Sequence, residues 1–189
     1  MKYLKSYQLF EDVNQPEISI REFLVQINIP QSHFENIVQW WEENRTHIKL
    51  HYFRFSSPQP IAGVFLGSDT ICVNSKLPMP PHIKLFLALH ESRHCDQHSE
   101  GRFMEGYYNT VTYNDKEGFL QAYRELEKDA NDFAVSSMRQ LGFEREMNFE
   151  EQRLRSNEMA GEMVFRMMRD DIQRLNPIDF FDLLEKQIS

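Results

Sequence analysis

The amino-acid sequence predicts an α+β fold. Two segments with helical capping signals come first, three β-rich runs occupy the middle, and every segment after Pro80 has helical character. The chain of 189 residues is long enough to bury one sizeable core, so we expect a single domain.

Two helices are predicted near the N-terminus. Ser19 and Glu22 have the spacing of a capping box, in which each residue bonds the backbone of the other, at the start of a helix over residues 19–29. The same signature recurs at Ser32, where glutamate again follows three positions later, and it predicts a second helix over residues 32–44.

Three strands are predicted next. Residues 47–55 alternate between apolar and polar side chains, which is the period of a half-buried strand. Residues 61–66 and 70–73 are short β-rich runs separated by Gly67-Ser68-Asp69, a plausible hairpin turn. We therefore expect a small antiparallel sheet of about three strands.

The second half of the chain is predicted to be helical. The segments are, in order, a helix over 83–98, a polar and Tyr-rich loop over 99–113, a long helix over 114–141 and a C-terminal helical segment over 148–189. Asn114 with Glu117 predicts a capping box for the long helix, and Gly142 predicts its end.

Composition narrows the class of protein. Charged residues are 26% of the chain and the formal net charge is −8, which argues against nucleic acid as a partner because phosphate binding needs clustered Lys and Arg. Two cysteines are too few for a disulfide framework. No run has the length of a membrane span, and the first twelve residues lack a signal-peptide core. We expect a cytoplasmic protein that binds neither nucleic acid nor membrane.

The helix over 83–98 contains the pattern H-E-x-x-H at His90-Glu91-Ser92-Arg93-His94. His90 and His94 lie one turn apart on one face, where two imidazoles can bind one Zn²⁺. Glu91 is placed to take a proton from a water that the metal has activated. The pattern therefore predicts a zinc site with a general base.

The surroundings of the motif favour a buried site. Residues 85–89 (LFLAL) are apolar on every side of the helix, which predicts a central, buried position. Two His and a Glu on a buried face need partners, because burying unpaired polar groups is costly. The alternative is a helix that emerges into solvent at His90, with both histidines exposed.

A catalytic zinc needs a third protein ligand, and the long helix offers one. On a helical wheel, Glu127 lies about 55° from the centre of the apolar stripe, whereas Asp129 lies about 105° away and Glu125 is on the opposite face. Glu127 is therefore the candidate third ligand; the alternative is a rim carboxylate paired with a basic neighbour. Asn131, one turn further on, could hydrogen-bond a ligand histidine.

Further side chains are candidates for substrate contacts. His98 shares the face of the two histidines but lies about 12 Å from His90 along the axis, so it is either a rim residue or a substrate contact. Four tyrosines could stabilise an oxyanion, with packing or loop anchoring as the alternative: Tyr107, Tyr108, Tyr113 and Tyr123.

Methionines at helical spacing characterise the C-terminal helical segment, namely Met159, Met163, Met167 and Met168. Core packing is one interpretation. An adaptable surface for a protein partner or for a homo-oligomer is the other, because Met side chains accept varied shapes.

The combined pattern resembles the ImmA/IrrE-type zinc metallopeptidases of bacteria and their mobile elements. The resemblance rests on HESRH, on the preceding PIAGVFLGSDTICVNSKLP and on the following EKDANDFA, and it covers about residues 61–138. The family often has Gly before the second His, where this chain has Arg93.

The resemblance implies roles for named residues. It makes His90, His94 and Glu127 the zinc ligands, with Glu91 as the general base. It makes Asn131 a residue that contacts the ligands but not the metal. It also implies an edge strand that aligns the substrate near residues 71–74.

These observations lead to one main hypothesis. Residues 1–189 are expected to form a single zincin-like domain, with its metal-site core at about 61–138 and its sheet packed on the H-E-x-x-H helix. Its expected activity is zinc-dependent hydrolysis of a peptide bond in a protein or peptide, with a regulatory protein as one candidate substrate. The rivals are a non-catalytic zincin-like module that binds a protein partner, and a metal-free helical protein.

Overall fold

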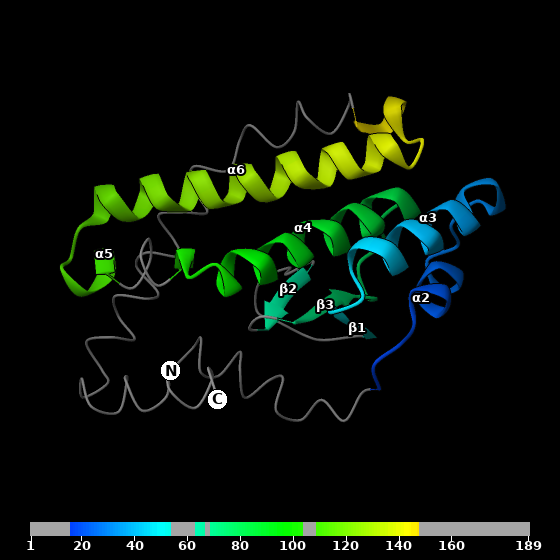
Figure 1. The fold of residues 1–189 in the computed structure, drawn as a ribbon, viewed down its shortest axis with the longest axis horizontal. Helices are drawn as coiled ribbons and strands as arrows, with labels where there is room; N and C mark the ends of the chain where they lie inside the picture. Colours follow the sequence, from blue (N-terminus) through cyan, green and yellow to red (C-terminus); the bar gives the residue numbers. More distant parts are fainter. Residues whose placement is uncertain (1–15, 54–62, 67–68, 104–108, 148–189) are drawn as a thin grey trace. The chain divides into compact units, whose positions relative to one another are not determined.

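The computed structural model describes residues 16–53, 63–66, 69–103 and 109–147 (Figure 1). Their elements are α2 (Ile20–Gln26), α3 (Gln31–Asn44), β1 (Lys49–Phe53), β2 (Gly63–Leu66), β3 (Thr70–Asn74), α4 (Pro81–Ser99), α5 (Asn109–Thr112) and α6 (Lys116–Gln140). This order of helices, strands and helices confirms the α+β class. The predicted C-terminal helical segment, with its methionines, lies outside the described residues. Within those residues, no helix combines the length and the apolarity that crossing a membrane requires.

The chain divides into two compact units. The larger contains Gln15–Asp96 and Lys128–Arg155, and the described part of the other lies within Gln97–Glu127. The boundaries fall inside α4 and α6, so each of these two continuous helices belongs to both units. The single domain over 1–189 stays a prediction.

The first predicted capping box is present, and the second is not. The Glu22 N–H donates to Ser19 Oγ at 3.2 Å, and the Ser19 N–H donates to Glu22 Oε2 at 2.7 Å. The expected box at Ser32 is wrong because α3 begins one residue earlier, after Pro30, which leaves Ser32 inside the first turn. Glu35 pairs instead with Arg21 at 3.0 Å.

The sheet is mixed, so the antiparallel prediction is wrong for one of its two strand pairs. The strand order is β1-β3-β2; β2 runs antiparallel to β3, but β1 runs parallel to it. The physical reason lies in β3, where residues 71–74 are all buried and therefore favour a central position with both faces covered. The implied edge strand near residues 71–74 is consequently wrong as well. Within the described residues, β1 and β2 are the edges.

Helix α4 lies between the sheet and α6 in the larger unit (Figure 1). Its residues Leu85, Ala88 and Leu89 are fully buried, which confirms the predicted central helix. On the sheet side, Cys95 Sγ lies 3.6 Å from the carbonyl oxygen of Thr70 in β3. The apolar cluster that includes these α4 residues extends to α2, α3, β1, β3 and the C-terminal half of α6, so α4 is at the centre of the core.

The long helix ends as predicted but begins differently. Gly142 has a φ of 91°, and its N–H donates to the carbonyl of Arg139 at 3.0 Å, which closes the last turn in the manner expected of a C-terminal Gly. At the start, Asp115 is the cap, because its Oδ1 accepts from the Gly118 N–H at 2.9 Å. Asn114, the predicted cap, precedes it in the left-handed region with a φ of 53°.

The loop predicted over residues 99–113 is helical in part. It contains α5, whose turn is closed by the Tyr113 N–H donating to the Asn109 carbonyl at 3.0 Å. Residues 104–108 of this segment lie outside the described residues.

The capping difference between Ser19 and Ser32 can be tested directly. Ser19→Ala should lower the free energy of unfolding by about 1 kcal/mol, because the first turn of α2 loses a hydrogen-bond acceptor. Ser32 is also exposed, but its side chain caps no helix. Ser32→Ala should therefore change the free energy of unfolding by less than about 0.5 kcal/mol. Urea unfolding of the two variants measures both values, and equal losses would contradict the assignment.

Candidate metal centre

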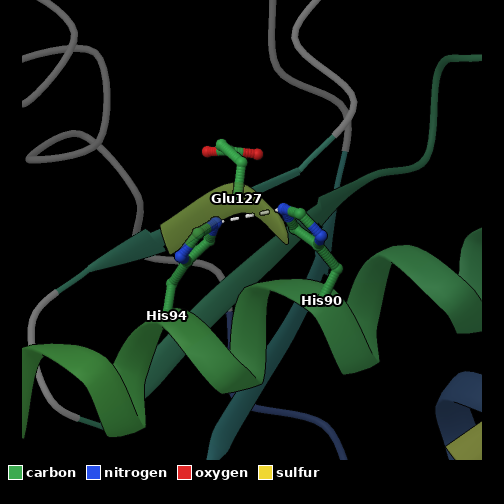
Figure 2. Close-up of side chains that lie close together, drawn as sticks. All are labelled: His90, His94 and Glu127. Atoms are coloured by element: carbon green, nitrogen blue, oxygen red, sulfur yellow. Dashed lines mark hydrogen bonds between the residues drawn. The ribbon is translucent and has the colours of Figure 1, made fainter. Parts of the chain in front are cut away.

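Helix α4 holds His90 and His94 one turn apart on a buried face. Their exposed fractions are 8% and 4%, so the alternative with solvent-exposed histidines is wrong. The two Nε2 atoms lie 3.0 Å apart, and the ring planes are nearly perpendicular at 86° (Figure 2). The Nε2 atom of each imidazole therefore points to the same place beside the helix.

Glu127 of α6 lies beside these two imidazoles (Figure 2). One ligand atom from each of the three residues lies within 4.8 Å of the other two. In the described ranges, this is the one group of three or more His, Cys, Asp or Glu side chains with metal-binding proximity. The structure thus brings together the three residues that the sequence predicts as ligands.

The donor set and its spacing fit a zinc ion. Two imidazole nitrogens and a carboxylate oxygen are zinc's usual ligands in catalytic sites. Bond lengths of about 2.0–2.1 Å in a tetrahedral site place ligand atoms about 3.3 Å from each other. The two Nε2 atoms, 3.0 Å apart, are already near that separation, and the ligand atoms of all three residues lie within 4.8 Å of one another. Three protein ligands leave a fourth position open.

Glu91, the predicted general base, packs against the backbone of β2. Its side chain is 8% exposed. A Cβ added to Gly63 of β2 would lie 3.0 Å from both Cγ and Oε1 of Glu91, a contact so tight that the glutamate side chain would have to shift by a few tenths of an ångström. Gly63 therefore permits the strand to approach the carboxylate. The sequence alone did not predict this role of Gly63; a lone Gly inside a β-rich run was the available signal.

Aromatic rings flank the two histidines. The Phe65 ring of β2 lies 5.3 Å from the His94 ring, and Phe86 of α4 lies 6.2 Å from His90, between ring centroids. These contacts restrict the imidazole orientations and provide an apolar surrounding, in which charge interactions are stronger than in water.

The two cysteines do not supply thiolates here. Cys72 of β3 is buried, and burial together with the charge of Glu91 raises the pKa of its thiol to about 12. Burial, followed by the same carboxylate, also raises the pKa of the Cys95 thiol. Both side chains are therefore protonated thiols at neutral pH, with low reactivity.

His98 and Asn131 occupy less central positions. His98 is half-buried on the last turn of α4, its ring lies 6.4 Å from that of Phe103, and burial lowers the pKa of its imidazole. Asn131 is half-buried on α6, one turn beyond Glu127. The substrate contact and the hydrogen bond to a ligand histidine remain predictions.

The candidate tyrosines differ in exposure. Tyr113 is 81% exposed, and Tyr123 is half-buried with its ring stacked on Phe119 at 6.4 Å. The stacking favours a packing role for Tyr123. Tyr107 and Tyr108 lie outside the described residues, so their proposed contacts stay predictions.

Comparison of the chain with models of protein families, with curated proteins and with solved structures found no match. The side-chain chemistry and geometry of the His90, His94 and Glu127 group are therefore the basis for proposing a function.

Metal content tests the three-ligand site. The wild-type chain, loaded with zinc and dialysed, should retain about one ion, and Glu127→Ala should lose it because two imidazoles alone bind zinc weakly. Glu125→Ala is the matched control, since Glu125 is exposed on the same helix and accepts a hydrogen bond from Gln121. Elemental mass spectrometry measures all three. Equal zinc in the two variants would remove Glu127 from the site.

Proposed function

We propose that this chain is a zinc-dependent metallopeptidase. The observation that carries the proposal is the proximity of His90 and His94 of α4 to Glu127 of α6, with the buried Glu91 next to His90 in the chain. Three zinc-type ligands with an adjacent carboxylate form the donor and base set of a hydrolytic zinc site.

Each residue has a role in the proposed reaction. His90, His94 and Glu127 hold the ion, which when bound supplies a Lewis acid that polarises a carbonyl and acidifies a water. Glu91 accepts a proton from the attacking water and then delivers it to the departing amine nitrogen. Burial of Glu91 beside β2 restricts the orientations of its carboxylate and shields the carboxylate from bulk water.

Strand β2 is the element that we propose aligns the substrate. It is an edge of the described sheet, and it carries both Gly63 beside Glu91 and Phe65 beside His94. An extended peptide can add to such an edge through backbone hydrogen bonds, which favours a peptide over a small molecule.

The proposed family follows from the motifs. HESRH with the EKDANDFA segment resembles the ImmA/IrrE-type metallopeptidases, and a zincin-like fold is proposed on that resemblance. A helix with both histidines, a strand beside its glutamate and a third ligand on a second helix support it.

Two observations favoured the alternative hypothesis, a non-catalytic module, and the structure offers another explanation for one of them. Arg93 occupies a position where the family often has Gly, but its guanidinium is directed to Asp129, at 2.9 Å, and to Asp96. Its side chain is therefore engaged in ion pairs with two acids. The second observation, the Met-rich segment, lies outside the described residues.

Substitution of the general base tests the mechanism. Glu91→Gln should bind zinc like the wild-type chain, because it changes no ligand, but it should lose at least about 100-fold in kcat/KM through loss of the proton acceptor. The zinc-loaded proteins are incubated with a random peptide library, and cleaved products are identified by mass spectrometry.

Three results would contradict the proposal. Undiminished cleavage by Glu91→Gln would exclude the assigned mechanism. Stoichiometric zinc in a wild-type chain that cleaves no peptide would favour the partner-binding module, and a fold that collapses on zinc removal would assign the ion a structural role.

The close contact between Gly63 and Glu91 predicts a second selective effect. Gly63→Ala should retain zinc but lower kcat/KM by about 10-fold, because the new methyl group displaces the Glu91 carboxylate by a few tenths of an ångström. Cleavage assays with a peptide from the library and zinc analysis of the same sample measure the two effects. Full activity in this variant would show that Glu91 need not approach β2.

A further inference from the structure

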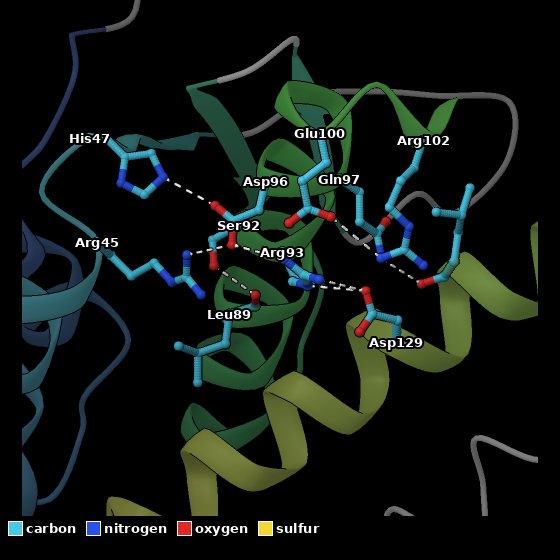
Figure 3. Close-up of polar contacts among 11 residues, drawn as sticks. Arg45, His47, Leu89, Ser92, Arg93, Asp96, Gln97, Glu100, Arg102 and Asp129 are labelled. Carbon is cyan, nitrogen blue, oxygen red and sulfur yellow. Dashed lines mark hydrogen bonds and ion pairs between the residues drawn. The ribbon is translucent and has the colours of Figure 1, made fainter. Parts of the chain in front are cut away.

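Arg93 connects the metal-binding helix to the helix that supplies the third ligand. Its Nε donates to Asp129 Oδ2 at 3.0 Å, and its Nη2 lies 2.9 Å from the same oxygen (Figure 3). Arg93 is the residue before His94 on α4, and Asp129 is two residues after Glu127 on α6. A charge contact thus spans the two helices next to the proposed ligands.

Asp129 and Glu127 lie on opposite sides of the buried stripe of α6. Ala130 and Ala134 on that stripe are fully buried. At about 100° per residue, Glu127 is about 60° to one side of Ala130 and Asp129 about 100° to the other. An ion pair to Asp129 on one side of the stripe therefore affects the rotation of α6 about its own axis. That rotation sets how close Glu127, on the other side of the stripe, lies to the histidines.

The apolar contact alone leaves this rotation weakly determined. Alanine side chains are small and their contacts are non-directional, so they bring helices close without selecting one rotation. A guanidinium with two donors on one carboxylate oxygen has a strong directional preference. The ion pair is a directional contact between α4 and α6, as is the hydrogen bond that Gln97 Nε2 donates to the Leu126 carbonyl oxygen at 2.9 Å.

Arg93 is itself held by a second acid. Its Nη1 lies 3.6 Å from Asp96 Oδ2, and the same oxygen accepts from Arg45 Nη1 at 2.7 Å (Figure 3). Arg45, at the end of α3, also lies over the Phe133 ring of α6 at 4.2 Å. Alternating charges thus extend from α3 through α4 to α6, so less side-chain entropy is lost when Arg93 binds Asp129.

We propose that Arg93 is a positioning residue for the metal centre, acting through Asp129 to set the rotation of α6 and hence the place of Glu127. The inference rests on the proposed zinc site and adds a residue pair that contacts neither metal nor substrate. It also gives a reason for a bulky Arg beside a ligand histidine.

Zinc affinity of paired variants tests the proposal. Arg93→Met keeps the length of the side chain without its charge, and Asp129→Asn keeps the shape of its partner. Each should weaken zinc binding by about 10-fold or more, measured by competition with a chromophoric chelator. Because the two residues act as one unit, the double variant should lose no more than either single variant.

Three controls separate positioning from general stability. Arg93→Lys should recover only part of the affinity, since one ammonium can still pair with Asp129 but lacks the two directed donors of the guanidinium. Lys128→Ala removes an exposed ion pair with Asp132 on the same helix and should bind zinc normally. Cobalt loaded in place of zinc should show the strong visible absorption of a four-coordinate site in the wild-type chain and a weaker band in Arg93→Met. Thermal unfolding of the metal-free proteins measures stability separately.

The outcomes distinguish this inference from the proposed function. Wild-type zinc affinity and an unchanged cobalt spectrum in Arg93→Met and Asp129→Asn would overturn the positioning role and leave the metal site intact. Additive losses in the double variant would also overturn it. A wild-type chain that binds no zinc would overturn the proposed function and this inference together.

Discussion

Burial of two imidazoles and a carboxylate in the middle of α4 is the constraint on which the rest of the structure depends. Polar groups in a core need partners, because their hydration is lost and the local dielectric is low. Here the Nε2 atoms of His90 and His94 converge, and Glu127 of α6 lies beside them. The apolar sequence around the motif holds α4 in the core, and the packing of β3 and α6 against it surrounds the polar group with fixed elements.

The proposed site combines contributions from several elements. Helix α4 supplies two ligands and the base, α6 supplies the third ligand, and β2 supplies a glycine that accommodates the base. A chain of alternating charges, from Arg45 to Asp129, directs α6 from the opposite side of its buried stripe. In this arrangement the polar contacts orient the helices, whereas alanines and other apolar residues allow the helices to pack closely. This division is how a small sheet and a few helices would support the proposed metal centre.

Much of the site could be predicted from sequence because it is encoded by local periodicity. His90 and His94 share a helix face through their spacing alone, Glu127 is the acid nearest the apolar stripe of its helix, and Gly142 ends that helix in the expected way. The partners of strands are not local, and alternation along a strand does not state which neighbour it pairs with; the parallel pairing of β1 with β3 was missed for this reason. Competition among neighbours explains the wrong caps: Pro30 starts α3 ahead of Ser32, and Asp115 replaces Asn114. Gly63 and the Arg93–Asp129 pair act across elements, so their roles emerge only from the fold.

The most direct test of a His90, His94 and Glu127 zinc site is X-ray absorption at the zinc edge of the zinc-loaded full chain. Four nitrogen or oxygen ligands are expected at about 2.0–2.1 Å, with the outer-shell scattering of two imidazoles. A sulfur ligand at about 2.3 Å would contradict this expectation, because it would require Cys72 or Cys95 as a thiolate. Scattering from six oxygen neighbours without imidazole would contradict it equally, since the ion would then lie outside the histidine pair.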